Sequence, residues 1–157
     1  LAWIHDPVRD VTAIASAGGG AWLVAADGAR TRLRRADPSA DLAALRGSAS
    51  GRYGERGRVR DILTEAAVGP IQMLRSAGQE YLALAEARLD YAVFSRILPW
   101  DHAAGALIYR EAGGVAGCID AENAAPIPYS PRRRTGPLLS APTPELWTRL
   151  RDIIVGR

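Results

Sequence analysis

The chain of 157 residues contains no lysine, so all 20 of its basic side chains are arginines. With 17 acidic residues, its formal net charge is only +3. A charge this small gives weak support to anionic ligands and weaker support to nucleic acid as a partner.

Cysteine is nearly absent as well. The single thiol, Cys118, excludes an internal disulfide framework and any metal site built from several cysteines. No apolar run approaches membrane-spanning length, and no basic-then-apolar signal peptide opens the chain. We therefore expect a cytoplasmic protein without a membrane partner. The first residue is Leu1 rather than methionine, and we expect the gene product to extend upstream of it.

The residues that are present predict a layered α/β fold. The apolar fraction of 48% is that of a globular protein with a core. Short apolar segments separated by turn residues predict antiparallel strands within residues 1–36. Strands then alternate with helices across residues 37–157, which is typical of an α/β domain. The expected helices cover 57–68, 78–87, 100–112 and the segment after a Thr143 cap; the expected strands cover 71–74, 91–94, 115–119 and 137–140.

The most informative segment is residues 98–114. Asp101 stands where a helix is expected to begin, and aspartate is among the best N-cap residues. The spacing places Ala104, Leu107, Ile108 and Glu111 on one face, and Gly113-Gly114 is expected to end the helix.

Two motifs in this segment carry a resemblance to a known family. Trp-Asp-x-Ala-Ala-Gly at 100–105, followed by Glu-Ala-Gly-Gly at 111–114, resembles the C-terminal signature of the inositol monophosphatase family. Arg75-Ser76-Ala77-Gly78 is similar to the Arg-Ser-x-Gly step of that family. The resemblance implies an α-β-α-β-α phosphatase fold. Residues 1–36 would be the remainder of an N-terminal α+β layer, and residues 37–157 the C-terminal α/β domain.

The resemblance also implies a function, namely Mg²⁺-dependent hydrolysis of a small phosphate monoester of inositol, a sugar, histidinol or a nucleotide. Asp101 would be a metal ligand, which suits the preference of Mg²⁺ for carboxylate oxygens. Ser76, Gly78 and Glu80 would bind the organic part of the substrate. By analogy, the protein would be a homodimer. On spacing alone, Asp101 is better interpreted as a plain helix cap than as a metal ligand. With the resemblance taken into account, the metal ligand is the better interpretation.

The chain departs from the family pattern at three places. The Glu-Glu pair and the Asp-Pro-x-Asp-Gly-Thr motif that hold metal in the family do not occur in it. Residues 6–10 begin with Asp-Pro but lack the Asp-Gly-Thr ending, so we assign no metal ligand there and no catalytic residue in the chain. Part of the active site is therefore expected upstream of Leu1. Phe94 stands seven residues before Asp101, where inositol-specific members have a glutamate. A phenyl ring cannot accept a hydrogen bond from a hydroxyl group, which argues against inositol phosphate as the preferred substrate.

Two other functions compete with hydrolysis. The arginines at 30–35 and 132–134 would suit a non-catalytic module that binds an anion or nucleic acid, although no aromatic residues alternate with them. A doubly wound nucleotide-binding domain is the third alternative, but no Gly-x-Gly-x-x-Gly follows a strand. His5 and His102 are interpreted as structural or solvated side chains.

Overall fold

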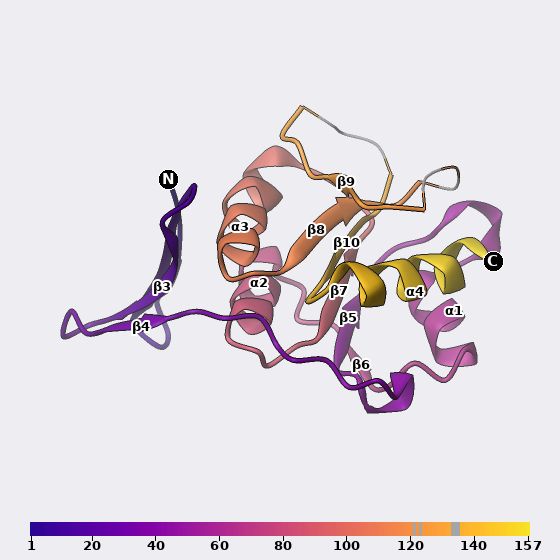
Figure 1. Ribbon diagram of the computed structural model, residues 1–157, viewed down its shortest axis with the longest axis horizontal. Coiled ribbons are helices and arrows are strands. Elements are labelled where there is room, and N and C mark those ends of the chain that lie inside the picture. Colours follow the sequence, from indigo (N-terminus) through magenta and orange to yellow (C-terminus); the bar gives the residue numbers. More distant parts are fainter. Residues whose placement is uncertain (121, 123, 133–135) are drawn as a thin grey trace.

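The computed structural model describes residues 1–120, 122, 124–132 and 136–157. Two β-sheets and two pairs of helices stack as alternating layers (Figure 1). The α/β class predicted from the sequence is confirmed, with four layers in the order sheet, helices, sheet, helices. Among the described residues, no helix has the length and apolar character needed to cross a membrane.

The first sheet is an antiparallel meander of four strands. Its members are β1 (Ala2–Asp6), β2 (Val11–Ser16), β3 (Gly20–Ala25) and β4 (Arg30–Arg32). The strands pair in sequence order, with Ile4 opposite Ala13 and Trp22 opposite both Ile14 and Arg32. Small buried residues, among them Ala13, Ala15 and Ala21, let the neighbouring helices approach one face closely. Strand β4 is shorter than the predicted 30–34.

The second sheet is mixed and has the order β6-β5-β7-β10-β8-β9. Strand β5 runs parallel to β6 and β7, whereas β10 runs antiparallel to β7 and β8. The strands are β5 (Gly47–Ala49), β6 (Ile71–Gln72), β7 (Tyr91–Phe94), β8 (Val115–Cys118), β9 (Ile127–Pro128) and β10 (Leu138–Ala141). The prediction for 71–74 was thus two residues too long.

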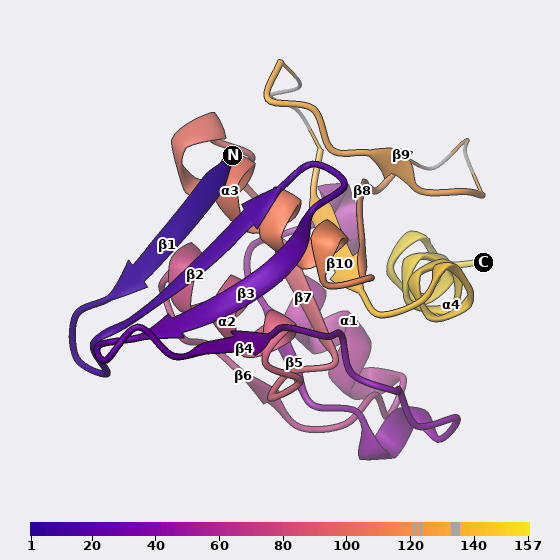
Figure 2. The same ribbon diagram turned by 60° about the vertical axis from the view of Figure 1, so that its left-hand side comes forward.

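Helices cover both faces of this second sheet. Helices α2 (Ala77–Ala85) and α3 (Pro99–Glu111) lie between the two sheets, while α1 (Val59–Glu65) and α4 (Pro144–Val155) pack on the outer face (Figures 1 and 2). Alternate residues of β7 serve the two cores. Phe94 faces the α2 and α3 side, and Val93 faces the α1 and α4 side. The division of the chain into domains at residue 37 stays a prediction.

The helix boundaries differ from the predictions in two instructive places. Helix α1 begins at Val59 instead of Gly57 and ends near Ala66, because Ala67 adopts a left-handed conformation with φ of 54°. The prediction that Asp101 caps α3 is wrong. The helix begins at Pro99, a residue favoured at the first helical position, and Leu98 is the N-cap.

The small residues of α3 have a packing reason. A Cβ atom on Gly105 would lie 2.0 Å from Cδ2 of Tyr81 on α2, so only glycine permits this helix crossing. At the other end, Gly113 takes the left-handed conformation with φ of 94°. The N–H of Gly114 then donates to the carbonyl of Tyr109 at 3.0 Å, which closes the helix with the expected glycine cap.

Candidate functional site

A surface pocket of about 440 Å³ lies where α2 and α3 begin, beside the edge strand β1. It brings Asp101 together with the turn that contains Ser76 and Gly78, although these positions are far apart in the sequence. Its lining consists of Trp3, Ile4, Arg75, Ser76, Ala77, Gly78, Trp100, Asp101 and Ala104. Three of the four residues predicted to bind metal or substrate therefore line one cavity.

Asp101 presents an available carboxylate to this pocket. It lies in the first turn of α3, and its exposed side chain has no hydrogen bond or ion pair within the described residues. The first turn of α3 lies at the positive end of the helix dipole. Across the described residues, no three histidine, cysteine, aspartate or glutamate side chains form a cluster that could hold a metal ion. Asp101 fits the role of one oxygen ligand of a hard cation, and the described residues do not complete such a site.

His102, the neighbour of Asp101, faces away from the pocket and anchors the start of α3. Its Nε2 lies 2.7 Å from the carbonyl oxygen of Arg96, which can only accept, so Nε2 carries the proton. Nδ1 then accepts a hydrogen bond from the Tyr81 hydroxyl at 3.3 Å. Burial lowers the pKa of His102 and favours this neutral form. The interpretation of His102 as a structural residue agrees with these contacts.

The turn before α2 offers hydrogen-bond donors to the pocket. Ser76 caps the helix, and its Oγ accepts the backbone N–H of Gln79 at 3.4 Å. Gly78 belongs to the first turn, where N–H groups have no partner within a helix. Arg75 adopts a left-handed backbone conformation with φ of 56°, which turns the chain sharply from β6 into α2. Such a turn is suited to binding an anion or a hydroxyl group.

Glu80 lies behind the pocket and does not line it. The side chain is buried, and its Oε1 accepts a hydrogen bond of 2.6 Å from the hydroxyl of Ser48 on β5. Burial raises the pKa of Glu80, while hydrogen bonds from Ser48 and the Leu74 backbone oppose that shift. The hydrogen bond from Ser48 ties Glu80 to β5. Its role as a substrate ligand stays a prediction.

Phe94 is also removed from the pocket. Its ring is buried and stacks on that of Tyr81, with centroids 5.1 Å apart. It also meets the His102 ring edge-on at 4.8 Å between centroids. Phe94, which occupies the position of the glutamate in inositol-specific members, is thus part of an aromatic cluster beneath the start of α3.

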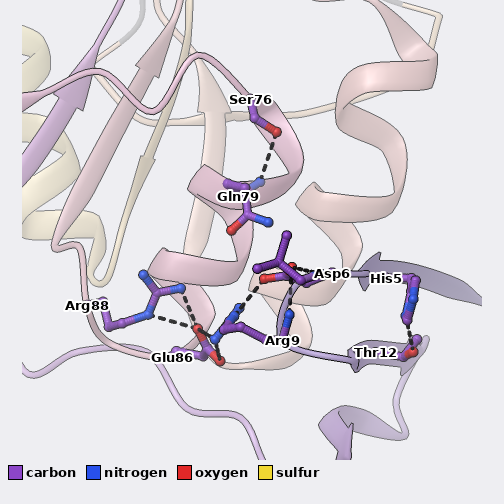
Figure 3. A network of polar contacts seen from close by, with 9 residues as sticks. His5, Asp6, Arg9, Thr12, Ser76, Gln79, Glu86 and Arg88 are labelled. Atoms are coloured by element: carbon purple, nitrogen blue, oxygen red, sulfur yellow. Dashed lines mark hydrogen bonds and ion pairs between the residues drawn. The ribbon is translucent and has the colours of Figure 1, made fainter. Parts of the chain in front are cut away.

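A polar network that we did not predict joins the end of β1 to helix α2 (Figure 3). Asp6, at the end of β1, accepts hydrogen bonds from the backbone of Val8 and from Nε of Arg9 at 2.6 Å. The nearby side chain of Gln79, next to Gly78, also contributes to lowering the pKa of Asp6. Arg9 continues the network to Glu86 at the end of α2, at 2.8 Å. The Asp-Pro turn that resembles a metal motif therefore joins the first sheet to α2.

Glu111 forms a second link between the layers. Its carboxylate oxygens accept the backbone N–H groups of Gly18 at 3.1 Å and Gly20 at 3.0 Å. These bonds lower the pKa of Glu111. The Glu-Ala-Gly-Gly motif thereby fixes the glycine-rich turn between β2 and β3. Spacing alone gave no sign of that contact.

The arginine clusters named in the sequence lie elsewhere. Arg32 stacks over the ring of Trp22 at 5.7 Å on the first sheet. Arg34 and Arg35 line a separate polar pocket near the end of α3. Arg133 and Arg134 lie outside the described residues, so the structure bears only on Arg132 of that cluster.

Comparison with known proteins adds to this geometry. The model of the inositol monophosphatase family matches residues 1–150. A fructose-1,6-bisphosphatase/inositol-1-monophosphatase of Thermotoga maritima is 32% identical over 115 residues, which are 73% of this chain and 42% of the relative. Both findings rest on sequence and agree with the motifs around Asp101.

Solved structures resemble the fold. A hypothetical protein of Pyrococcus horikoshii, described as similar to inositol-1 monophosphatase, superimposes with a TM-score of 0.75 and 21% identity, covering 97% of this chain and 56% of that one. SuhB of Mycobacterium tuberculosis gives a TM-score of 0.73 and 23% identity, with coverages of 98% and 59%. The chain thus spans about half the length of the relatives it matches.

Proposed function

Because the chain belongs to the inositol monophosphatase family, we propose that it takes part in hydrolysing a small phosphate monoester at the pocket between α2 and α3. The observation that carries the proposal is the placement of the Asp101 carboxylate beside the Ser76–Gly78 turn. A carboxylate ligand and free N–H donors around one cavity are the components that a metal-assisted phosphatase requires.

In the proposed mechanism, Asp101 would supply one oxygen ligand to Mg²⁺. The bound cation would polarise the phosphate group and lower the pKa of water. The N–H groups at the start of α2 would orient the polar part of the substrate, and Trp3 and Trp100 would form the apolar walls. His102 keeps Asp101 in position through Arg96 and Tyr81. The remaining carboxylates of the metal site would come from residues other than those described.

The proposed substrate is a small phosphorylated metabolite other than inositol phosphate. Phe94 is buried among aromatic rings and cannot bind a substrate hydroxyl. The name of the Thermotoga relative includes both a sugar bisphosphate and an inositol phosphate, which supports a breadth of esters in the family. A cytoplasmic homodimer completes the proposal, on the basis of the single buried cysteine and of family analogy.

The test is phosphate release from inositol, sugar, histidinol and nucleotide phosphates, with and without Mg²⁺. We expect Asp101→Asn to lower metal-dependent phosphate release by at least roughly 100-fold. Mutating a residue that only hydrogen-bonds a metal ligand already lowers metal affinity or activity by about 10–100-fold. Asp10→Asn is the matched control, since Asp10 lies in an exposed turn away from the pocket. Unchanged activity in Asp101→Asn would sink the site assignment. A salt-sensitive nucleic-acid complex without hydrolysis would favour the binding-module alternative.

A further inference from the structure

We infer that the substrate carries a second acidic group, bound by arginines of the loop after β5; this inference rests on the proposed function. The loop borders a cavity of about 300 Å³, which we call the arginine pocket. Its lining consists of Ala49, Ser50, Gly51, Arg52, Arg58, Arg60 and Met73. No acidic side chain lines it.

The backbone holds two of these arginines side by side. Arg52 and Arg58 form an antiparallel bridge, and directly opposed residues of such a pair project to the same side. The loop between them closes with the N–H of Tyr53 donating to the carbonyl of Gly57 at 2.9 Å. Gly57 has φ of 104°, a conformation that suits glycine. The closed loop therefore presents two guanidinium groups together.

These guanidinium groups are available for a ligand. Arg52 and Arg58 have no side-chain hydrogen bond or ion pair within the described part of the chain, and both are exposed. Arg60 pairs only with the exposed Asp61, at 3.1 Å. Neighbouring cations without a carboxylate repel one another, and an anion between them removes that repulsion. Guanidinium groups match phosphate and carboxylate oxygens in a bidentate geometry.

The arginine pocket lies next to the candidate site. Strands β5, β6 and β7 are parallel, and the edge where such strands end is where α/β sheets bind ligands. Met73, just after β6, lines the arginine pocket, and Arg75, two residues later, lines the site with Asp101. One strand-end segment therefore borders both cavities.

A second contact joins the same two regions. The N–H of Ser50 donates to the carbonyl of Val93 at 3.0 Å. A Cβ atom on Gly51 would lie 1.9 Å from the Cβ atom of Ser95, so the two loops touch. Ser95 opens the loop that leads to Asp101. A substrate whose phosphate ester lies at Asp101 can thus extend a second charged group toward Arg52 and Arg58. Phe94 cannot bind a substrate hydroxyl, and the ion pairs with these arginines would take over that part of substrate recognition.

Isothermal titration calorimetry with two matched pairs of probes tests this inference. Fructose 1,6-bisphosphate is compared with fructose 1-phosphate, and 2-phosphoglycerate with glycerol 2-phosphate, in EDTA at low salt. The first pair reports a second phosphate and the second pair a carboxylate. We expect at least one doubly acidic ligand to bind about tenfold more tightly than its partner, from two charge-assisted contacts.

The variant Arg52→Gln/Arg58→Gln should abolish this preference. Arg56→Gln is the control, because it removes one positive charge from the same loop while Arg56 packs against Gly156 at the end of α4. The arginines are exposed, so the melting temperatures of the variants should stay within a few degrees of wild type.

Equal binding within both pairs, or a preference that survives Arg52→Gln/Arg58→Gln, would overturn the inference. The calorimetry needs no turnover. A protein that keeps the preference but hydrolyses no ester would refute the proposed function and leave the arginine pocket standing.

Discussion

At the scale of single residues, buried and hydrogen-bonded side chains fix the positions of the residues that line the candidate site. His102 bonds the Arg96 carbonyl and the Tyr81 hydroxyl, and Glu80 joins Ser48 to the turn before α2. Asp101 itself has no such partner among the described residues, which leaves its oxygens free for a ligand. Rigid support beneath a free carboxylate is the arrangement expected where a metal ligand must keep one geometry.

Asp6 should make stability depend on pH. Its hydrogen bond from Arg9 holds the pKa of the carboxyl well below the ordinary 3.8. A carboxyl whose pKa is lower in the folded state stabilises the protein above its unfolded pKa, and that stabilisation is lost as pH falls through the folded value. We therefore expect the melting temperature of the wild type to drop below about pH 4, and Asp6→Asn to show a lower plateau with a shallower decline.

Circular dichroism melts from about pH 7 to about pH 3 would measure this difference. Asp10→Asn, in the same turn, should follow the wild-type curve. Glu111, whose pKa is also lowered, should preserve part of the decline in Asp6→Asn. Parallel curves for the wild type and Asp6→Asn would contradict the role given to the network.

At the scale of elements, the packing of α2 against α3 shapes the pocket, because both helices begin at it. Replacing glycine by alanine within a helix normally stabilises it by about 1 kcal/mol. In Gly105→Ala, the new Cβ would lie 2.0 Å from Tyr81. We expect this variant to lose about 2 kcal/mol instead, because overpacking forces the helices apart.

Urea denaturation would show directly whether Gly105→Ala raises or lowers the free energy of unfolding. Gly78→Ala is the control for stability, since its nearest new contact would be an ordinary 3.5 Å to Cγ2 of Ile4. A stabilised Gly105→Ala would show that α2 and α3 are not closely packed.

The elements also show what the sequence could and could not predict. The hairpins within residues 1–36 and the Thr143 cap of α4 have strong local signals, and the structure contains them. Strand β5 was missed because Gly47-Ser48-Ala49 has no β-branched or aromatic residue. Asp101 was predicted to cap α3, but the cap is Leu98, three residues earlier, because Pro99 is favoured at the first helical position.

The sequence predicted only those parts of the site that have local motifs. Local motifs identified Asp101 and the Ser76–Gly78 turn, and the structure brings them together. The bonds that join Asp6 through Arg9 to Glu86, and those of Glu111 to the Gly18–Gly20 turn, join distant segments. Contacts of this kind depend on tertiary packing and leave no periodic pattern in the chain.

At the scale of the whole molecule, the site lies where three layers meet. Trp3 belongs to the first sheet, Asp101 and Ser76 belong to the helical layer, and the parallel strands of the second sheet end beside the arginine pocket. Figures 1 and 2 show α2 and α3 between the two sheets. The two regions proposed to bind ions are therefore joined by one strand-end segment. This arrangement explains why links between layers, such as Asp6 and Glu111, would matter for the site as well as for stability.

The central claim, that Asp101 holds a metal ion in the pocket, is tested most directly by NMR with Mn²⁺. The paramagnetic ion broadens nearby signals, and four tryptophans give separate indole N–H reporters. Trp3 and Trp100 line the pocket, whereas Trp147 is buried on the far side of the second sheet, with its Nε1 3.0 Å from the Leu139 carbonyl. We predict that Trp3 and Trp100 broaden first, that Trp147 stays sharp, and that Asp101→Asn abolishes the selective broadening. Broadening that persists unchanged in Asp101→Asn, or that begins at Trp147, would contradict the claim.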